Sequence, residues 1–158
     1  MLTLETVCSY GATVQPELAS LFDPVFIALE DVEPGSGKYD TKPIVAEKFV
    51  LSQSHVTFTS QMILYSKLRP YLDKAIRPKR NGVTTSEFIP IFSYINPDYL
   101  LLFLHTASFL KRINSDAYGI KMPRVKKETF LKTIIPVWGD KTTAVALKIV
   151  EEVSALLS

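Results

Sequence analysis

The first part of the chain alternates hydrophobic and polar positions, which is the pattern of half-buried β-strands. Val56 and Phe58, for example, are separated by one polar residue between two β-branched and aromatic stretches. Turn residues such as Pro34, Gly35 and Gly37 interrupt these stretches. We therefore expect strands in four regions, which are residues 24–32, 49–51, 62–68 and 82–92.

The spacing of apolar residues becomes helical after residue 95. Asn96 is a good capping residue and Pro97 suits the first helical position, so we expect a helix from here to about Ile113. This helix is apolar around most of its circumference, so it must be covered on more than one side. For residues 1–22 we expect a short helix or turns. For residues 126–134 we expect a further helical turn or two, and for residues 134–138 a short strand.

A last helix can be capped by Asp140 and carries a stripe of apolar residues three or four positions apart. The stripe consists of Ala146, Val150, Val153 and Leu157. Because it continues to the end of the sequence, we expect that this helix is cut off or that it packs against something outside the chain, such as a second copy. All the elements together predict an α+β fold: one domain over residues 1–139 with a strand-rich mixed sheet and a buried helix, and a C-terminal helix over residues 140–158.

Composition narrows the class of protein. A length of 158 residues and a hydrophobic content of 47% suit one domain with a true core. No run of about 18 uncharged apolar residues exists, and the opening residues lack a basic segment before an apolar stretch, so we expect neither a membrane-spanning helix nor a secretory signal. Cys8 is the single cysteine, which excludes an internal disulfide and fits the reducing cytoplasm.

Charge is distributed unevenly along the chain, although the formal net charge is only +2. Residues 1–60 hold eight acids and three lysines, a balance of −5, whereas residues 61–132 hold thirteen Lys or Arg and five acids, a balance of +8. Such asymmetry points to a polyanionic partner, which is a nucleic acid, an acidic membrane surface or an acidic protein. We favour nucleic acid because membrane-binding segments usually place their cations on an amphipathic helix, whereas these cations lie among turns.

The basic residues form two clusters. Pro70 and Pro78 prevent the first cluster from being one long helix, so its cations should follow an irregular path that can track DNA phosphates. The first cluster contains Lys67, Arg69, Lys74, Arg77, Lys79 and Arg80, and the second contains Lys121, Arg124, Lys126 and Lys127. We expect both clusters to converge into one ridge that fits a double helix.

Short polar side chains follow the first cluster directly. Arg can bind guanine with two hydrogen bonds, Asn can bind adenine in the same way, and Glu accepts a hydrogen bond from cytosine. The sequence therefore predicts a base-reading set next to the phosphate-binding cations, consisting of Arg80, Asn81, Thr84, Thr85, Ser86 and Glu87.

Candidate catalytic features are weak. Residues 35–38 read GSGK but do not complete the motif of a phosphate-binding loop, and Tyr39 stands where its hydroxyl residue should be, so a plain turn is the better interpretation. His55 and His105 have no partner at metal-ligand spacing, and His105 is expected to be packed or partnered in the core. No nucleophile or nucleotide-binding motif is present, so the sequence does not argue for an enzyme.

Six segments in a fixed order resemble one target-recognition domain of a type I restriction–modification specificity subunit. The resemblance extends over residues 24–137 and includes LYSKLRPYL, TTSEFIPI and the late pattern GIKMPRVKKETFLKTIIPV. It implies a non-catalytic, sequence-specific duplex-DNA-binding subunit with two such domains separated by long paired helices. It also implies that S-adenosylmethionine, Mg and ATP bind to the partner subunits, which supply methyltransferase and restriction activity, while this chain itself needs no cofactor and no metal.

Two other hypotheses stay open at this stage. The chain could be a protein-interaction module that keeps the recognition-domain scaffold and uses its last helix to bind a partner. It could also be a small nuclease or hydrolase, although no metal or nucleophile cluster supports that class. Within the leading hypothesis, the chain is a half-sized subunit that dimerises, a fragment of a longer protein, or an isolated relative.

Overall fold

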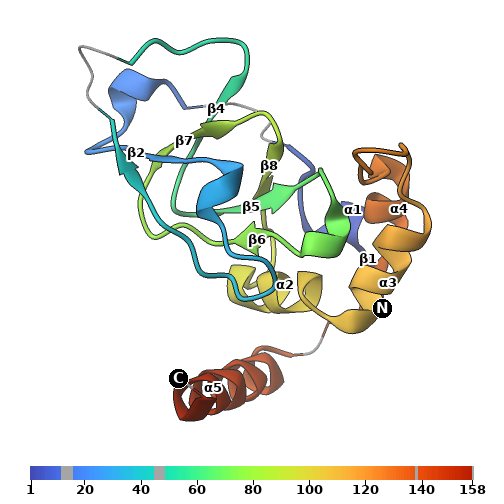
Figure 1. Ribbon diagram of the computed structural model, residues 1–158. Helices are drawn as coiled ribbons and strands as arrows, with labels where there is room; N and C mark the ends of the chain where they lie inside the picture. The colour runs from blue at the N-terminus through green and yellow to red at the C-terminus, as the bar shows by residue number, and fades with distance from the viewer. Residues whose placement is uncertain (12–15, 45–48, 138, 158) are drawn as a thin grey trace.

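A mixed sheet forms one layer of the computed structural model, which describes residues 1–11, 16–44, 49–137 and 139–157. Its strands lie in the order β3 (Lys42–Pro43), β2 (Val25–Ile27), β7 (Gly82–Thr85) and β4 (His55–Phe58). β2 and β7 run parallel, and the two outer pairs are antiparallel (Figure 1). The α+β class with a strand-rich mixed sheet is confirmed.

A second, antiparallel sheet is buried on both faces. It consists of β6 (Ala75–Ile76), β5 (Met62–Ser66) and β8 (Phe88–Phe92), with β5 in the centre. Because successive side chains of a strand point to opposite faces, β5 supplies two separate cores. Ile63 and Tyr65 belong to the cluster shared with the helices, whereas Met62 and Leu64 belong to the cluster shared with the mixed sheet.

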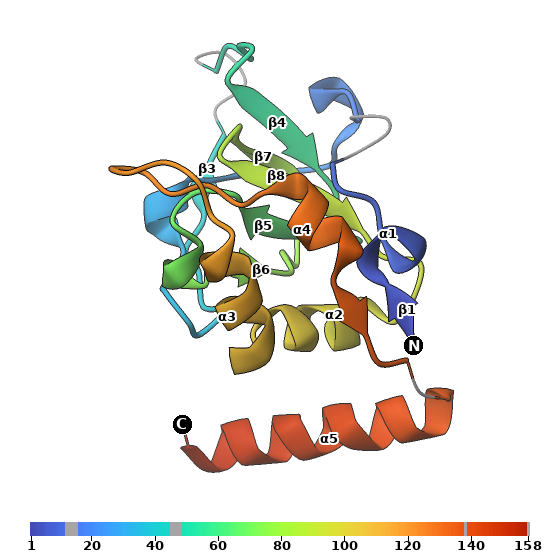
Figure 2. The same cartoon turned by 90° about the vertical axis from the view of Figure 1, so that its right-hand side faces the viewer.

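Helices cover the outer face of this second sheet (Figure 2). They are α1 (Leu4–Val7), α2 (Pro97–Leu104), α3 (Ala107–Ser115) and α4 (Lys127–Lys132). A two-stranded sheet of β1 (Leu2–Thr3) and β9 (Ile134–Ile135) holds the N-terminal segment next to α4. Short 3-10 helices occupy Leu18–Ser20, Leu29–Asp31 and Pro70–Leu72.

The predicted helix from Asn96 to Ile113 is two helices. Asn96 caps α2 as expected, since its side-chain oxygen accepts hydrogen bonds from the next two free backbone N–H groups. The helix ends at Leu104 because Thr106 adopts an extended conformation and caps α3, with its hydroxyl accepting from the Phe109 N–H. The continuous apolar pattern hid this second cap.

Two predicted strands are shorter or divided, and one is wrong. Residues 24–32 form a strand only to Ile27, because the Asp31 carboxylate accepts the Ala28 N–H at 2.8 Å and a 3-10 turn follows. Residues 82–92 form β7 and β8, which belong to different sheets. Residues 49–51 are not a strand in the structure.

Gly82 allows β2 and β7 to approach closely. A Cβ atom at this position would lie 2.0 Å from the carbonyl oxygen of Val25 and 2.9 Å from the Phe58 ring. The first of these atoms is backbone within a parallel strand pair, so it cannot move without separating the strands. Gly82 is therefore a packing requirement of the mixed sheet.

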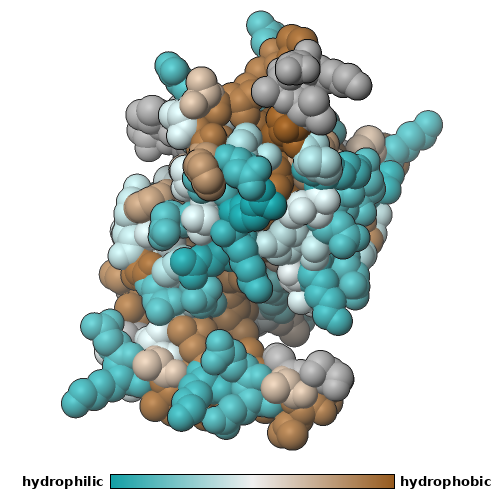
Figure 3. All heavy atoms as spheres, turned by 90° about the vertical axis from the view of Figure 1, so that its left-hand side faces the viewer, coloured by the Kyte–Doolittle hydropathy of each residue, from teal (hydrophilic) through white to brown (hydrophobic). Residues whose placement is uncertain are grey.

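The C-terminal helix α5 (Asp140–Leu157) lies below α2 and apart from both sheets (Figures 1 and 2). The helix begins at Asp140, as predicted. The Gly139 carbonyl accepts the Thr143 N–H, so Asp140 lies inside the first turn and does not cap the helix. Thr143 is buried and Leu147 packs against the helix-side core. Figure 3, viewed from the side where α5 ends, shows this helix as a separate lobe that exposes hydrophobic residues.

Most of the predicted partner stripe on α5 faces solvent. Ala146 is half-buried, whereas Val150, Val153 and Leu157 are 39%, 48% and 83% exposed. Val145, Ile149 and Leu156 are also exposed, so the helix is apolar on more than one side. Among the described helices, none has the length and apolar character that a membrane span requires.

Candidate nucleic-acid interface

Three distant segments meet at the end of β5. The Lys67 N–H donates to the Glu87 carbonyl at 3.1 Å, and the Lys67 carbonyl accepts the Val125 N–H at 2.8 Å. Lys67 thus lies between the β7–β8 turn and the segment that leads into α4. The fold therefore brings part of the first basic cluster into direct contact with the second.

Arg69 adopts an unusual backbone conformation at this junction. Its φ of 47° is left-handed, a region that a residue with a Cβ atom occupies at an energetic cost. The Arg69 N–H donates to the Pro123 carbonyl at 2.7 Å. Asp73, at the other end of the short helix Pro70–Leu72, is also left-handed, so both ends of this turn are sharply bent.

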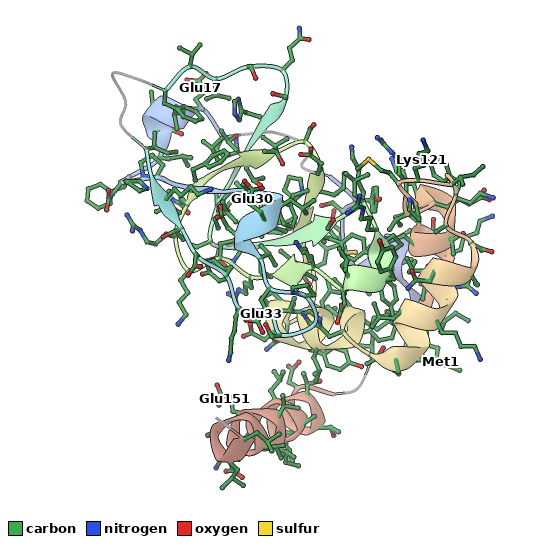
Figure 4. The ribbon with its side chains drawn as sticks, viewed as in Figure 1. Met1, Glu17, Glu30, Glu33, Lys121 and Glu151 are labelled. Carbon is green, nitrogen blue, oxygen red and sulfur yellow. The ribbon has the colours of Figure 1, made fainter. Side chains whose placement is uncertain are left out.

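A narrow hairpin projects from the same junction. Tyr118 and Arg124 exchange two backbone hydrogen bonds, of 3.1 and 2.8 Å, which close a loop over residues 119–123. Arg124 also pairs with Leu68 across an antiparallel bridge. Figure 4 shows Lys121 on this loop, beyond the end of α3 and before α4.

We call the cations around this junction the hairpin surface. Lys67 is half-buried and the other members are exposed, and within the described part of the chain none of them forms an ion pair. Lys127 lies over the ring of Tyr10, 5.8 Å from its centre. The hairpin surface consists of Lys67, Arg69, Lys121, Arg124, Lys126 and Lys127.

The rest of the first basic cluster is held elsewhere, so the single predicted ridge is not formed. Arg77 pairs with Asp98 at 2.7 Å, and Arg80 binds the Asp23 carboxylate at 2.5 Å. Lys74 donates to the Leu29 carbonyl at 2.8 Å. Lys79 is exposed and lies in the connection between β6 and β7. This connection runs on the β2 side of the molecule, whereas the hairpin lies on the α4 side (Figure 1).

Two members of the predicted base-reading set have structural tasks. Thr84 is fully buried, and its hydroxyl donates to the Ile27 carbonyl at 2.7 Å, so it cannot reach a base edge. The Asn81 side-chain oxygen accepts the Ser60 N–H at 2.8 Å, which fixes the entry to β7. Both residues therefore help to hold the mixed sheet. For Thr84, the prediction that it reads bases is wrong.

The remaining candidates lie at the β7–β8 turn. Ser86 and Glu87 are half-buried there, and Glu87 is bonded through its carbonyl to Lys67 on the hairpin surface. The hydroxyl of Thr85 is buried and has no partner within the described residues. This turn places short polar side chains next to exposed cations, which is the arrangement that the sequence predicts for reading bases.

Reactive groups in the described part of the chain are inactivated or used structurally. Burial raises the pKa of the Cys8 thiol to about 12, so the nucleophilic thiolate is not populated at neutral pH. His105 lies 2.9 Å from both Asp73 carboxylate oxygens and from the Ala75 carbonyl, which confirms that it is partnered. No three His, Cys, Asp or Glu side chains of the described residues are grouped as a metal site.

The sequence interpretation missed the apolar side chains on this side of the molecule. Tyr71, Tyr118 and Met122 are 58%, 56% and 45% exposed, and Ile120 is fully exposed. For Ile120 and Met122 the signal is local, because both stand between Gly119 and Pro123 in a turn that has no strand or helix to bury them.

Comparison with known proteins gives one sequence relative and several similar structures. No family model matches the chain. The specificity subunit of the type I restriction enzyme EcoDI from Escherichia coli is 26% identical over 112 residues, which covers 71% of this chain and 25% of the relative. This chain therefore spans about a quarter of that relative's length.

The fold is similar to that of two solved structures. The HsdS subunit from Thermoanaerobacter tengcongensis matches with a TM-score of 0.77 and 17% identity, over 99% of this chain and 42% of that one. A chain from a structure on complex assembly and conformational transition of the type I R-M system matches with a TM-score of 0.73 and 18% identity, over 99% and 41%. The resemblance of this chain to a target-recognition domain of a type I specificity subunit is thereby confirmed.

Proposed function

We propose that this chain binds duplex DNA in a sequence-specific way, without catalysing a reaction, as part of a type I restriction–modification specificity subunit. The observation that carries the proposal is the hairpin surface, where segments around residues 67, 87 and 124 converge through backbone hydrogen bonds and present exposed cations. The similarity to a type I specificity subunit supports the same function.

Each part of the interface has its own task. Arg69, Lys121, Arg124 and Lys126 bind phosphates and set the position of the domain on the duplex. Ser86 and Glu87 approach the base edges from the adjoining turn, where a carboxylate can accept from cytosine and a hydroxyl can donate or accept. Arg77 and Arg80 are engaged in ion pairs with Asp98 and Asp23 and make at most a weak contribution to DNA binding.

Partner subunits supply the chemistry in this proposal. Methyltransferase subunits bind S-adenosylmethionine, restriction subunits bind ATP and Mg, and this chain directs them to a DNA site. The exposed apolar residues of α5 join a second recognition domain or a second copy of the chain. The expected location of such an assembly is the cytoplasm.

The salt dependence of DNA binding tests the proposal. If four to six phosphates are neutralised, affinity for a duplex selected from a randomised pool falls by roughly two to three decades between 50 and 200 mM salt. Replacing Lys121, Arg124 and Lys126 together by Ala lowers the slope of the salt dependence by about three. A control that replaces the exposed cations Lys38, Lys79 and Lys141 removes the same charge and leaves the slope nearly unchanged.

The α5 surface supports a second function, a protein-interaction module without specific DNA binding. Three consecutive turns of this helix expose Val145, Ile149 and Val153. Flat salt dependence, or no recovery of any duplex at low salt, would decide for this alternative. Equal effects of the two triple replacements would instead show that the hairpin surface is not the DNA contact.

A further inference from the structure

The tip of the hairpin is apolar although it stands fully in solvent. Ile120 is 100% exposed and its neighbour Met122 is 45% exposed. Such side chains gain nothing within the fold at this position, because no described core cluster includes them. Their exposure leaves an apolar tip available to a partner.

The hairpin is held in one position at its base. Besides the two Tyr118–Arg124 hydrogen bonds, the Pro123 carbonyl accepts the Arg69 N–H and the Val125 N–H donates to the Lys67 carbonyl. Gly119, with a φ of 97°, makes the turn possible, and a Cβ atom there would lie 2.9 Å from the Met122 carbonyl oxygen. A tip that is fixed in advance loses little conformational freedom when it binds.

Apart from Lys121, the side chains of the tip cannot read a major groove by hydrogen bonding. Residues 119–123 are Gly, Ile, Lys, Met and Pro, which provide no amide, carboxylate or hydroxyl group. Isoleucine and methionine are instead among the residues that DNA-bending proteins insert between base steps from the minor groove. Lys121 within the tip and Arg124 at its base are exposed and match the charge of the phosphates that border that groove.

We propose that the hairpin tip enters the minor groove of the bound duplex and that Ile120 acts as a wedge at a base step and kinks the DNA. This inference rests on the proposed DNA-binding function. It assigns the hairpin a separate task, since the β7–β8 turn reads base edges while the tip selects for a step that unstacks easily. Pyrimidine–purine steps have that property.

The bend of the duplex tests the wedge. A duplex selected by the unmodified chain carries a fluorescent donor and acceptor at its two ends, so that binding reports the end-to-end distance by energy transfer. We expect the unmodified chain to shorten this distance. Ile120→Ala should restore the distance of the free duplex and weaken binding roughly tenfold. The substitution removes three buried carbons, each of which contributes about fourfold to affinity. Part of this loss is offset because the Ala variant no longer has to kink the DNA.

Control variants separate the wedge from other effects. Ile120→Leu keeps a wedge side chain and should keep the bend. Phe22→Ala removes another exposed apolar side chain, 90% exposed and outside the hairpin, and should leave both bend and affinity unchanged. Because Ile120 is fully exposed, its substitution leaves the fold intact, so a change in binding is not a loss of folded protein.

Four outcomes would overturn the inference. If Ile120→Ala binds with the full bend, or the unmodified chain leaves the duplex straight, the wedge is wrong while the proposed function stands. If no duplex is recovered at low salt, the proposed function fails as well. If the chain binds phosphatidylserine vesicles through Ile120 and the DNA bend is unaffected by its replacement, the tip is a membrane contact.

Discussion

The backbone N–H of Arg69 donates to the carbonyl of Pro123 at 2.7 Å and so joins the end of β5 to the hairpin before α4. Arg69 can make this bond because its φ of 47° turns the chain sharply before the helix Pro70–Leu72. The position of the hairpin therefore depends on the backbone of Arg69, while its guanidinium group stays exposed for a partner.

This division of roles predicts that folding and DNA binding respond differently to substitution of Arg69. Arg69→Gly keeps the left-handed conformation without the steric cost of a Cβ atom, so the free energy of unfolding should match or exceed that of the unmodified chain by up to about 1 kcal/mol. DNA affinity should fall and the salt slope should decrease by about one. Urea denaturation and DNA titration check the two expectations, and an unchanged affinity would remove Arg69 from the interface.

Gly82→Ala should weaken the mixed sheet. The new Cβ atom would meet the Val25 carbonyl oxygen at 2.0 Å, and we expect a loss of roughly 1–3 kcal/mol in the free energy of unfolding because β2 and β7 must separate. Gly139→Ala is the matched control, since among the described residues, its chain neighbours aside, no atom lies within 4 Å of a Cβ atom there. Equal unfolding midpoints of the two variants in urea would contradict the close approach.

Asp73→Asn should test the bond between the short turn and the helical layer. Asp73 accepts from His105 and is itself left-handed, and Asn tolerates that conformation, so the substitution changes the charge and not the backbone. We expect a loss of about 1–2 kcal/mol in the free energy of unfolding, measured by urea denaturation. Asp23→Asn is a suitable control because Asp23 is also left-handed but exposed, and its loss should cost well under 1 kcal/mol.

Cys8 predicts a loss of stability at alkaline pH. Burial raises the thiol pKa from 9.0 to about 12, so between these values the unfolded chain releases a proton that the folded chain retains. The free energy of unfolding should therefore decrease as the pH rises from 9 toward 12, with a slope of up to about 1.4 kcal/mol per pH unit from this group. Cys8→Ala should show a shallower decrease in the same series, and parallel curves would show that the thiol is not the cause.

The exposed stripe of α5 predicts self-association or pairing with a similar helix. Val153→Asp places a charge in that stripe and should shift the chain toward the monomer in sedimentation velocity, without lowering its stability, because Val153 is 48% exposed. Glu152→Ala, at an exposed position of the same helix, should leave the sedimentation coefficient unchanged. A chain that is monomeric at all concentrations, with or without Val153→Asp, would refute this surface as a dimer contact.

Local signals in the sequence predicted local structure well. Asn96 and Pro97 start α2 as expected, and the last helix begins at Asp140. The break at Thr106 was missed because a hydroxyl cap within an apolar run gives no contrast in hydrophobicity. The division of residues 82–92 between two sheets was missed because β7 and β8 have the same apolar character and differ only in their distant partners.

The candidate interface could be predicted only in part for the same reason. The contact between Lys67 and Val125 joins segments that are far apart in the chain. The pattern of charges along the sequence indicated that these segments are basic, but not that they meet. Arg80 looked available because Asp23, its ion-pair partner, lies 57 residues away. Thr84 looked like a base reader because its buried hydroxyl bond is made to another strand.

The four hydrogen bonds that fix the hairpin all run between main-chain atoms. Two of them join Tyr118 and Arg124, one joins Arg69 and Pro123, and one joins Lys67 and Val125. Peptide groups are the same whatever side chain they carry. Residues 120–122 can therefore be exchanged during evolution, or in the laboratory, while the framework beneath them keeps its shape. A protein that must acquire new target preferences without losing its fold benefits from variation confined to such an interchangeable tip.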